Sequence, residues 1–320
     1  MPTDDTTAAR VAVVGSYAKA IVITADRIPT RGETLVGRDY RQTFGGKGSD
    51  MAVQAARLGA AVDFIGVVGD DPFGREFLDL LADEGVTTTH VRVTRDQPTG
   101  VGLIIKDEAG HNVIVVDPGA NAVFSADDVA AASAPLGRAR VALAQLEIPL
   151  DTALAGLAAA KRAGSLTVLN PAPALPLATV LPPDGLAGVD VITPNETEAR
   201  VLLGLDPHSN EDNRLIADRL LAMGAGAVVI TRGEHGVDLF TPEDHVHVAP
   251  HAVDVVDSNG AGDSFNAGLA VALAEGRALD ESVRFANAVA ALCCESWETV
   301  PSYRDRATVD AFLAESGVRR

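Results

Sequence analysis

Short, continuously apolar runs separated by helical stretches recur along most of this 320-residue chain. They are V-A-V-V-G at 11–15, V-D-F-I-G-V-V-G at 62–69, R-V-A-L-A-Q-L-E at 140–147, L-T-V-L-N at 166–170, V-D-V-I-T-P-N at 189–195 and A-V-V-I-T-R-G at 227–233. Continuous apolar runs indicate strands buried on both faces, and strands that alternate with helices indicate right-handed crossovers. The sequence therefore predicts an α/β fold with a mostly parallel central sheet that helices cover on both faces.

Two segments differ from these runs in their pattern of apolar and polar residues. Between residues 21 and 44, short β-prone pieces alternate apolar and polar residues around P-T-R-G-E, as half-buried strands do. Between residues 91 and 116, V-G-L-I-I-K and N-V-I-V-V flank the turn D-E-A-G, which predicts a hairpin. These two separated segments could form one small sheet apart from the core.

Composition narrows the function classes. Apolar residues make up 47% of the chain and aromatic residues only 4%, so Ala, Val and Leu must build the core. A net charge of −18 disfavours nucleic acid and anionic membranes as partners, and no uninterrupted apolar run reaches the ~18 residues of a membrane helix.

The adjacent Cys293 and Cys294 are poorly placed for a disulfide, and the polar N-terminus has no signal-like region, so we expect a cytoplasmic protein. His245, His247 and His251 lack a nearby Cys or carboxylate pattern, and we expect them at the surface rather than on zinc.

The stretch V-V-D-S-N-G-A-G-D-S-F-N-A-G-L at 255–269 predicts a strand that ends at Asp257, a tight turn and the start of a helix. Gly260 and Gly262 would leave the backbone N–H groups of the helix start open to a phosphate. Asp263 lies among these N–H groups, where a carboxylate would repel phosphate unless it took a proton from an attacking hydroxyl. The alternative is that Asp263 merely caps the helix.

A second Gly-rich motif, F-G-G-K-G-S-D, occupies residues 44–50 and precedes another helical pattern. Gly45 and Gly46 would let the backbone pass close to a ligand, and the N–H groups that follow could bind hydroxyls or an oxyanion. The motif has neither the spacing of a Walker A loop nor that of a dinucleotide-binding fingerprint. The alternative is a hinge turn with an exposed Lys47.

Together these two motifs resemble the ribokinase, or PfkB, family of carbohydrate kinases. The resemblance continues in chain order through G-S at 15, G-D-D-P-F-G at 69, G-A-N at 119, N-P-A-P at 170, T-P-N-E-T-E at 193 and T-R-G-x-x-G at 231. It implies a three-layer ribokinase-like sandwich, α/β in class, with a mostly parallel central sheet and a small β-sheet lid. The large domain would comprise residues 1–16, 47–90 and 122–320, and the lid residues 17–46 and 91–121.

The same resemblance implies a small sugar as acceptor, with ATP and Mg²⁺ as cofactors. Asp263 would deprotonate the acceptor hydroxyl, while the amides of Gly260, Ala261 and Gly262 would hold the transferred phosphoryl group. The sugar would be bound by Gly45, Gly46, Lys47, Asp50 and Glu147, and the nucleotide by Asn195, Thr231, Gly233 and Asn287. Glu198 would bind Mg²⁺ through water, and Asp257 and Ser302 would bind an activating K⁺. For N-E-T-E at 195–198 the alternative is a capped helix start. In relatives the lid often pairs with a second subunit, which predicts a homodimer.

The sequence also departs from the ribokinase pattern. Ribokinases read G-S-x-N-x-D after the first strand, whereas Ala18 and Ala20 stand at those two places here, and Asp50 replaces a usual Asn. These changes argue against ordinary ribose as the acceptor. Lys19 is a new charge that would pair with Asp50, meet the substrate or, alternatively, point to solvent. Glu298 stands where cation-activated relatives have Gly, and its side chain could fill the space of the K⁺.

We therefore expect an ATP-dependent kinase that phosphorylates a primary hydroxyl of a small sugar or sugar derivative. Ribokinase proper and nucleoside kinase remain alternatives, although few aromatic residues are present to line a nucleoside site. A sugar-phosphate kinase would need a basic cluster, for which Arg31, Arg38 and Arg41 are candidates. Outside the enzymes, the alternative is a catalytically inactive sugar-binding regulator.

Overall fold

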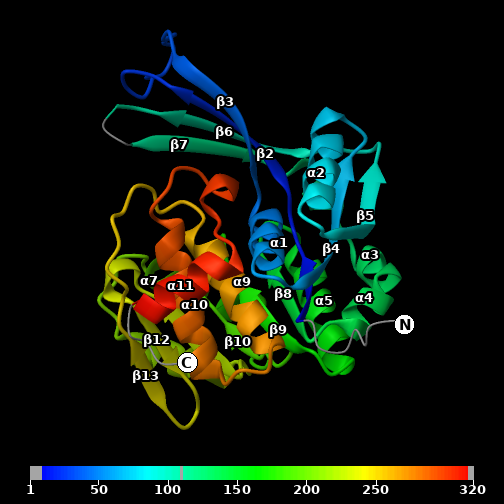
Figure 1. Cartoon of the computed structure of the whole chain (residues 1–320), viewed down its shortest axis with the longest axis vertical. Coiled ribbons are helices and arrows are strands. Elements are labelled where there is room, and N and C mark those ends of the chain that lie inside the picture. Colours follow the sequence, from blue (N-terminus) through cyan, green and yellow to red (C-terminus); the bar gives the residue numbers. More distant parts are fainter. Residues whose placement is uncertain (1–8, 109–110, 316–320) are drawn as a thin grey trace.

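The computed structural model describes residues 9–108 and 111–315. In these residues nine strands form one sheet, which in Figure 1 runs from β13 at the lower left to β5 at the right. Their order across the sheet is β13 (His245–Val248), β12 (Val237–Phe240), β11 (Ala227–Thr231), β10 (Val191–Ile192), β9 (Leu166–Asn170), β8 (Val141–Gln145), β1 (Arg10–Val14), β4 (Ala61–Gly69) and β5 (Thr87–Thr94). In this order, the strands from β11 to β5 run parallel to one another, and β12 and β13 extend one edge antiparallel. The predicted mostly parallel sheet is confirmed.

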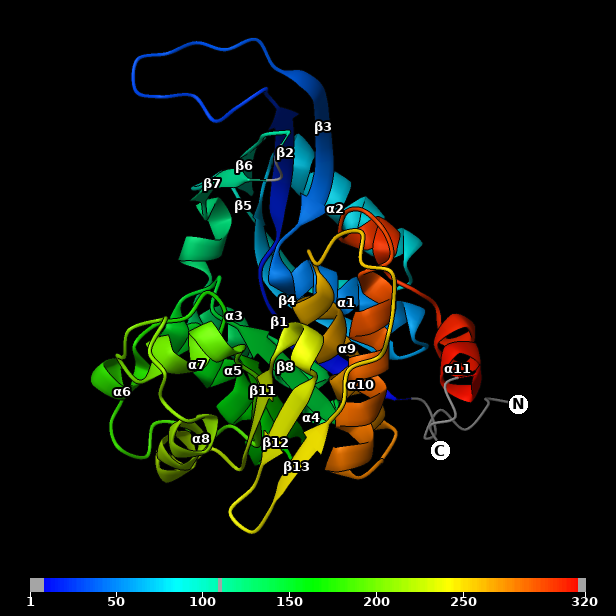
Figure 2. The same ribbon diagram turned by 90° about the vertical axis from the view of Figure 1, so that its left-hand side faces the viewer.

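Helices cover both faces of this sheet, as Figure 2 shows from its edge. In β1, Val11 and Val13 pack into the core on the side of α1 (Lys47–Arg57), α9 (Ala261–Ala274) and α10 (Leu279–Cys293). The alternate residues Ala12 and Val14 pack into the core on the side of α5 (Leu150–Arg162) and α8 (Asn213–Ala222). This two-sided burial is why the strands read as continuous apolar runs. The remaining helical elements are α2 (Pro72–Asp83), η1 (Gly119–Val123), α3 (Ala126–Ala131), α4 (Ser133–Arg138), α6 (Leu177–Val180), α7 (Glu196–Leu202), η2 (Gly233–His235), η3 (Val300–Ser302) and α11 (Arg306–Glu315).

A separate four-stranded sheet projects beyond the large sheet, at the top of Figure 1. Its strand order is β3 (Arg38–Gly45), β2 (Ala18–Thr24), β6 (Gly100–Lys106) and β7 (Asn112–Asp117). The antiparallel pairing of β6 with β7 confirms the predicted hairpin, although residues 109–110 of its turn lie outside the described residues. We call this sheet the small sheet below.

The predicted boundary of the second lid segment is wrong. Residues 91–94 do not join the small sheet, because they form the end of β5 and pair in parallel with Gly66 to Gly69 of β4. As the outermost strand of the large sheet, β5 is only half-buried. Its side chains therefore alternate between apolar and polar like those of the small sheet, and the pattern alone cannot separate the two.

The strand predicted before Asp257 is also absent. Residues 249–260 form an irregular connection in which Val255 and Val256 are 69% and 41% exposed. The N–H groups of Val256 and Asp257 donate to Cys294 O, at 2.8 and 3.2 Å, instead of to a neighbouring strand. The antiparallel pair β12 and β13 occupies this edge of the sheet. The Pro-rich run at 174–184 contains the short helix α6. Among the described helices, none combines the length and apolar character needed to cross a bilayer.

Candidate active site

A cavity of about 630 Å³ lies between the small sheet and the large sheet with its helices. Its lining comes from β2, β3, β6 and β7 on one side, and from the helix starts of α1 and α9 with the connections around them on the other. The cavity brings together predicted site residues from segments far apart in the chain: Gly45, Gly46, Lys47, Asp50, Glu147, Asp257, Gly260 and Asp263. Other predicted site residues lie outside this lining: Asn195, Glu198, Thr231, Gly233, Ala261, Gly262, Asn287 and Ser302.

Asp263 lies in the first turn of α9 and is only 8% exposed. Its side chain does not cap the helix, because Gly260 is the N-cap and no side chain makes the capping bond. Burial raises the pKa of Asp263 to about 6, an effect that Lys47 opposes and that the charges of Glu147 and Glu198 reinforce. A carboxyl group with such a pKa is well matched to accept a proton near neutral pH.

Gly260 forms the turn that opens this helix. Its φ of 79° lies in the left-handed region, and a Cβ atom would come within 2.9 Å of Tyr303 Oη. Glycine is therefore required both by backbone conformation and by space. Of the three predicted phosphoryl donors, Ala261 differs from the prediction, because its N–H donates to Ser258 O at 3.2 Å. Gly260 and Gly262 remain the predicted amides at this helix start.

Lys47 is the first residue of α1 and follows Gly46, whose φ of 94° and close approach to Tyr17 exclude a side chain. The backbone N–H of Lys47 donates to Glu147 Oε2 at 2.8 Å, and Ser16 Oγ donates to the same oxygen at 2.6 Å. The side chain is half-buried and lines the cavity, and the charge of Asp263 is the main cause that raises its pKa. The alternative of a hinge with an exposed Lys47 is therefore wrong.

Asp50, on the same helix, is 3% exposed, and its Oδ1 has no hydrogen-bond partner among the described residues. Burial, together with the charges of Asp263 and Glu147, raises its pKa well above the usual range. Lys19 does not pair with Asp50, and it does not point to solvent. It is 5% exposed, with Nζ 2.5 Å from Glu76 Oε2 and 4.8 Å from the centre of the Phe44 ring.

The predicted nucleotide residues lie at the ends of β10 and β11 and on α10. Asn195 and Glu198 form a capping box at the start of α7, in which Asn195 Oδ1 accepts from Glu198 N at 2.8 Å and Glu198 Oε2 accepts from Asn195 N at 2.9 Å. The capped helix start is therefore present. A bridge joins the backbones of Asn195 and Thr231, and Gly233 follows in η2. On α10, Asn287 Nδ2 donates to Ala249 O at 2.9 Å.

The residues predicted for K⁺ already have protein partners. Asp257 Oδ1 accepts from Asn259 N at 3.0 Å, and Asp257 Oδ2 accepts from Glu298 N at 3.3 Å. Glu298 has a φ of 70°, which glycine adopts with less strain, and its Oε1 lies 2.9 Å from Arg41 Nη1 of the small sheet. Ser302 Oγ donates to Thr299 O at 2.7 Å. The described residues contain no group of three or more His, Cys, Asp or Glu arranged to hold a metal ion.

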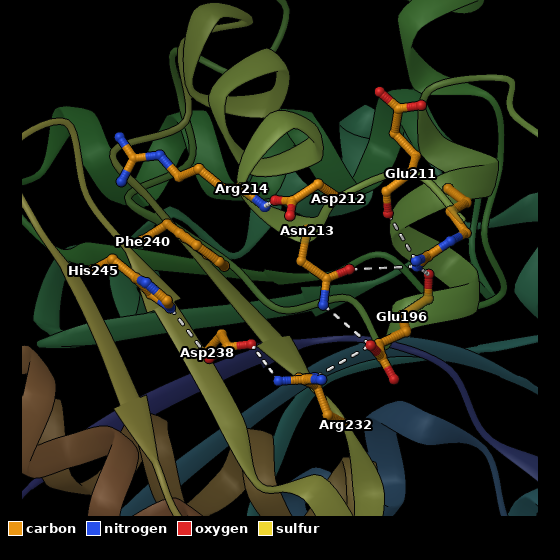
Figure 3. A pocket seen from close by; sticks show the side chains of 10 residues that line it. Glu196, Glu211, Asp212, Asn213, Arg214, Arg232, Asp238, Phe240 and His245 are labelled. Carbon is orange, nitrogen blue, oxygen red and sulfur yellow. Dashed lines mark hydrogen bonds and ion pairs between the residues drawn. The ribbon is translucent and has the colours of Figure 1, made fainter. Parts of the chain in front are cut away.

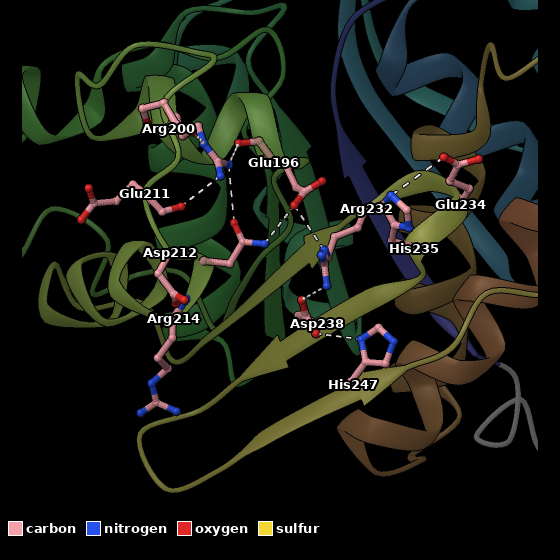
Figure 4. A network of polar contacts seen from close by, with 12 residues as sticks. Glu196, Arg200, Glu211, Asp212, Arg214, Arg232, Glu234, His235, Asp238 and His247 are labelled. Atoms are coloured by element: carbon pink, nitrogen blue, oxygen red, sulfur yellow. Dashed lines mark hydrogen bonds and ion pairs between the residues drawn. The ribbon is translucent and has the colours of Figure 1, made fainter.

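A second cavity, of about 340 Å³, lies beside the strand end at Thr231 and holds none of the predicted catalytic residues (Figure 3). Arg232 crosses it, with Nε 3.2 Å from Glu196 Oε1 and Nη1 3.0 Å from Asp238 Oδ2. Asp238 Oδ1 also lies 3.2 Å from His245 Nε2 and 2.9 Å from His247 Nδ1, and Figure 4 shows the same network from another side. The predicted surface position of these two histidines is confirmed, since their side chains are 43% and 47% exposed, but their contact with Asp238 was not predicted. The network fixes the T-R-G turn against α7.

Three residues of the site were not predicted from the sequence. Asn259 and Thr299 line the cavity, and Ser16 orients Glu147 through its hydroxyl group. Ser16 belongs to the G-S pair after the first strand, which was the available signal. Thr299 lies in the segment that departs from the family pattern, so no motif marked it.

Comparison with known proteins gives consistent matches over the whole chain. Residues 8–306 match the model of the pfkB family carbohydrate kinases. The chain is 37% identical to mouse ribokinase over 309 residues, which are 94% of each protein. It is 33% identical to the deoxyribokinase of Salmonella typhi, covering 80% of this chain and 82% of that protein. The structure of Arabidopsis thaliana ribokinase complexed with ribose and ATP superposes with a TM-score of 0.86 at 31% identity, covering 96% of this chain and 99% of that one.

Proposed function

Since this chain belongs to the pfkB family of carbohydrate kinases, we propose that its larger cavity is where a sugar hydroxyl receives the γ-phosphoryl group of ATP. The protein is an ATP-dependent carbohydrate kinase with an alcohol group as phosphate acceptor. The observation that carries the assignment of the site is the position of Asp263. Its buried carboxyl group lies beside the open start of α9 and faces the same cavity as Lys47 and Glu147.

In the proposed reaction, Asp263 takes the proton of the acceptor hydroxyl while the hydroxyl oxygen forms a bond to the γ-phosphorus. The bond from that phosphorus to the bridging oxygen breaks, and ADP leaves with the electron pair. The amides of Gly260 and Gly262 bind the oxygens of the transferred group, where negative charge is concentrated. Lys47 adds a positive charge to the same region. Closure of the small sheet, as a lid, would exclude water as a competing acceptor.

The nucleotide would lie along Asn195 and Thr231 at the ends of β10 and β11, Gly233 of η2 and Asn287 of α10. Mg²⁺ would be bound mainly by phosphates and water, because hard cations of this kind keep several water ligands. Glu198 fits a water-mediated contact, since its capping bond uses Oε2 and its charge influences the pKa of Asp263. For a K⁺ near Asp257 and Ser302 we propose only a test, in which the rate of phosphate transfer is compared with and without K⁺.

The acceptor would be a small sugar or sugar derivative that offers a primary hydroxyl to Asp263, with Gly45, Gly46, Lys47, Asp50 and Glu147 binding its other groups. Ribokinase proper is the main alternative, because ribokinases are among the relatives. A sugar phosphate is disfavoured, since Arg38 pairs with Asp26 at 2.8 Å and Arg41 pairs with Glu298. Sugar binding without phosphate transfer would favour the regulator. We also propose a cytoplasmic location, in keeping with two free cysteines.

The small sheet would also join two subunits in a homodimer. Its face away from the cavity exposes Leu103, Val113 and Val115, which are 50%, 43% and 63% exposed. We call these residues the outer lid face. Exposed apolar side chains that lie next to one another often mark a surface that contacts another protein.

The mechanism is tested with Asp263→Asn, assayed by ADP release over a panel of sugars, polyols and nucleosides with ATP and Mg²⁺. Loss of the base is expected to lower kcat by at least about 100-fold without unfolding the protein. Asp254→Asn is the matched control, because it makes the same exchange at an exposed residue outside the cavity. Near-normal turnover by a folded Asp263→Asn variant would refute the mechanism.

A further inference from the structure

The two walls of the larger cavity differ in chemistry. The wall on the side of the large sheet carries the ionisable groups of Lys47, Asp50, Glu147 and Asp263. The opposite wall, from β2, β6 and β7 of the small sheet, carries a run of residues without hydrogen-bonding side chains: Ala18, Ala20, Val22, Gly102, Ile104, Ile114 and Val116. A molecule between these walls meets polar groups on one side and hydrocarbon on the other.

Polar side chains of the small sheet lie at the margins of this apolar wall. Lys106 and Asn112 line the cavity at the far end of β6 and β7, where they pair with each other. They are four residues beyond Gly102 along the strand, roughly 13 Å at the rise of a β-strand. Thr43 of β3, opposite Ala20, supplies one hydroxyl. Asn121 of η1 also lines the cavity, but its side chain already accepts from Tyr17 N at 3.1 Å and donates to Tyr17 O and Pro118 O at 2.8 and 3.0 Å. Small acceptors close to Asp263 therefore have little on this side to bond with.

Asp50 supplies the complementary observation on the polar wall. Its Oδ1 is buried without a partner, a condition that a bound hydroxyl donor would relieve. Glu147 Oε2 already accepts two protein hydrogen bonds, from Ser16 and from the N–H of Lys47. The side of the acceptor that lies over α1 is therefore the side that must carry hydroxyl groups.

We propose that the preferred acceptor is a sugar with hydroxyls along the edge over Lys47, Asp50 and Glu147, and without free hydroxyls on the side that faces β2. Deoxy sugars and O-methyl sugars have this character. A fully hydroxylated pentose would bury hydroxyls against Ala18, Ala20 and Val22 without partners, which is unfavourable. This inference rests on the proposed function and narrows its substrate class.

Substrate preference gives the first test. The wild-type protein would be assayed for ADP release with ribose, with 2-deoxyribose and 3-deoxyribose, and with ribose O-methylated at the same positions. At least one modified acceptor is expected to show a kcat/KM about 10-fold or more above that of ribose. If ribose equals or exceeds every modified acceptor, the inference is wrong while the kinase assignment stands. Absence of turnover with all sugars would refute the proposed function and, with it, this inference.

Variants of the two walls give the second test. Ala20→Ser adds a hydroxyl to the apolar wall and is expected to lower the preference for the best modified acceptor over ribose by at least about 3-fold. Ile23→Ser, on the same strand but outside the cavity lining, is the matched control and should leave that ratio unchanged. Asp50→Ala should raise KM for ribose and modified acceptors alike. An Ala20→Ser ratio equal to that of the wild type would contradict the inference.

Discussion

At the scale of single residues, the charge of Asp263 sets how the reaction should respond to pH. Its pKa of about 6 results from burial and from the carboxylates of Glu147 and Glu198, against the opposing charge of Lys47. The reactive form is the carboxylate, and its fraction rises with pH. We therefore expect kcat/KM to increase about tenfold per pH unit below 6 and to level off above it. A flat profile between pH 5 and 7 in the folded enzyme would exclude Asp263 as the base.

Two neighbours of Asp263 should move the midpoint of this profile in opposite directions. Lys47→Met removes the positive charge that lowers the pKa of Asp263, so the midpoint should move to higher pH. Glu198→Gln removes a negative charge that raises this pKa, so the midpoint should move to lower pH. Both variants should also have a lower kcat. The loss should be roughly 10-fold or more for Lys47→Met, because Lys47 lines the site. The midpoint of log kcat/KM against pH is the measurement, and shifts of the same sign would contradict this account.

The predictability of the site follows from how its residues are connected. Asp263, Gly260 and Gly46 could be predicted, because tight turns at helix starts leave a local signature of glycines and a carboxylate. The partner of Lys19 could not be predicted, since Glu76 lies 57 residues away in the chain. Charge pairing across such separations depends on the packed fold and leaves no spacing to detect.

At the scale of the elements, the ion pair of Lys19 with Glu76 joins β2 of the small sheet to α2. Lys19 is buried beside the rings of Phe44 and Phe73, whereas the side chain of Glu76 is 46% exposed. Glu76→Ala would leave a buried ammonium group without its partner and should lower the free energy of unfolding by about 1 to 3 kcal/mol. Lys19→Met removes the charge along with the pair and should cost less. Chemical denaturation of both variants measures the difference, and an equal or larger loss for Lys19→Met would contradict the argument.

Arg41, on β3 at the edge of the small sheet, contacts Glu298, which lies in the connection between α10 and η3. The side chains are 49% and 30% exposed, so the pair should contribute less than about 1 kcal/mol to stability. Because Glu298 lines the cavity and donates its N–H to Asp257, loss of the contact should loosen the lid over the acceptor. We expect Arg41→Ala to raise KM for the acceptor by about 2- to 5-fold while the melting temperature stays nearly unchanged.

Arg38→Ala is the matched control for this lid contact. Arg38 lies on the same strand, but its partners Asp26 and Glu108 follow β2 and β6 of the small sheet itself. Steady-state kinetics of the two variants, with the acceptor varied at saturating ATP, should therefore show an increased KM for Arg41→Ala alone. Equal KM values for both variants would mean that the contact with Glu298 has no part in acceptor binding.

The helices and strands were predicted correctly where a sequence pattern occurs in only one kind of structure. The buried parallel strands were predicted because burial on both faces produces continuous apolar runs. The run Val255–Val256 has the same β-branched character, yet it lies exposed in an irregular connection, since β12 already occupies the position next to β11. Which segment takes an edge position of a sheet is decided in the assembled fold, so local β-propensity cannot predict it.

At the scale of the whole molecule, association must overcome the net charge of −18. The outer lid face offers apolar surface for this association, and like charges on two copies oppose it over about 10 Å at 0.1 M salt. We therefore expect a dimer that becomes tighter as the salt concentration rises. Val115→Glu places a charge in the centre of the outer lid face and should give a monomer at micromolar concentration in sedimentation velocity.

Val180→Glu is the control that separates contact from charge in this experiment. Val180 is 56% exposed on α6, and the exchange adds the same negative charge to the molecule away from the small sheet. If net repulsion governs association, both variants should weaken the dimer equally. If the outer lid face is the contact, Val180→Glu should sediment like the wild type and only Val115→Glu should dissociate. A wild-type protein that stays monomeric at high salt would refute the dimer, and the lid would then close over the cavity within a single subunit.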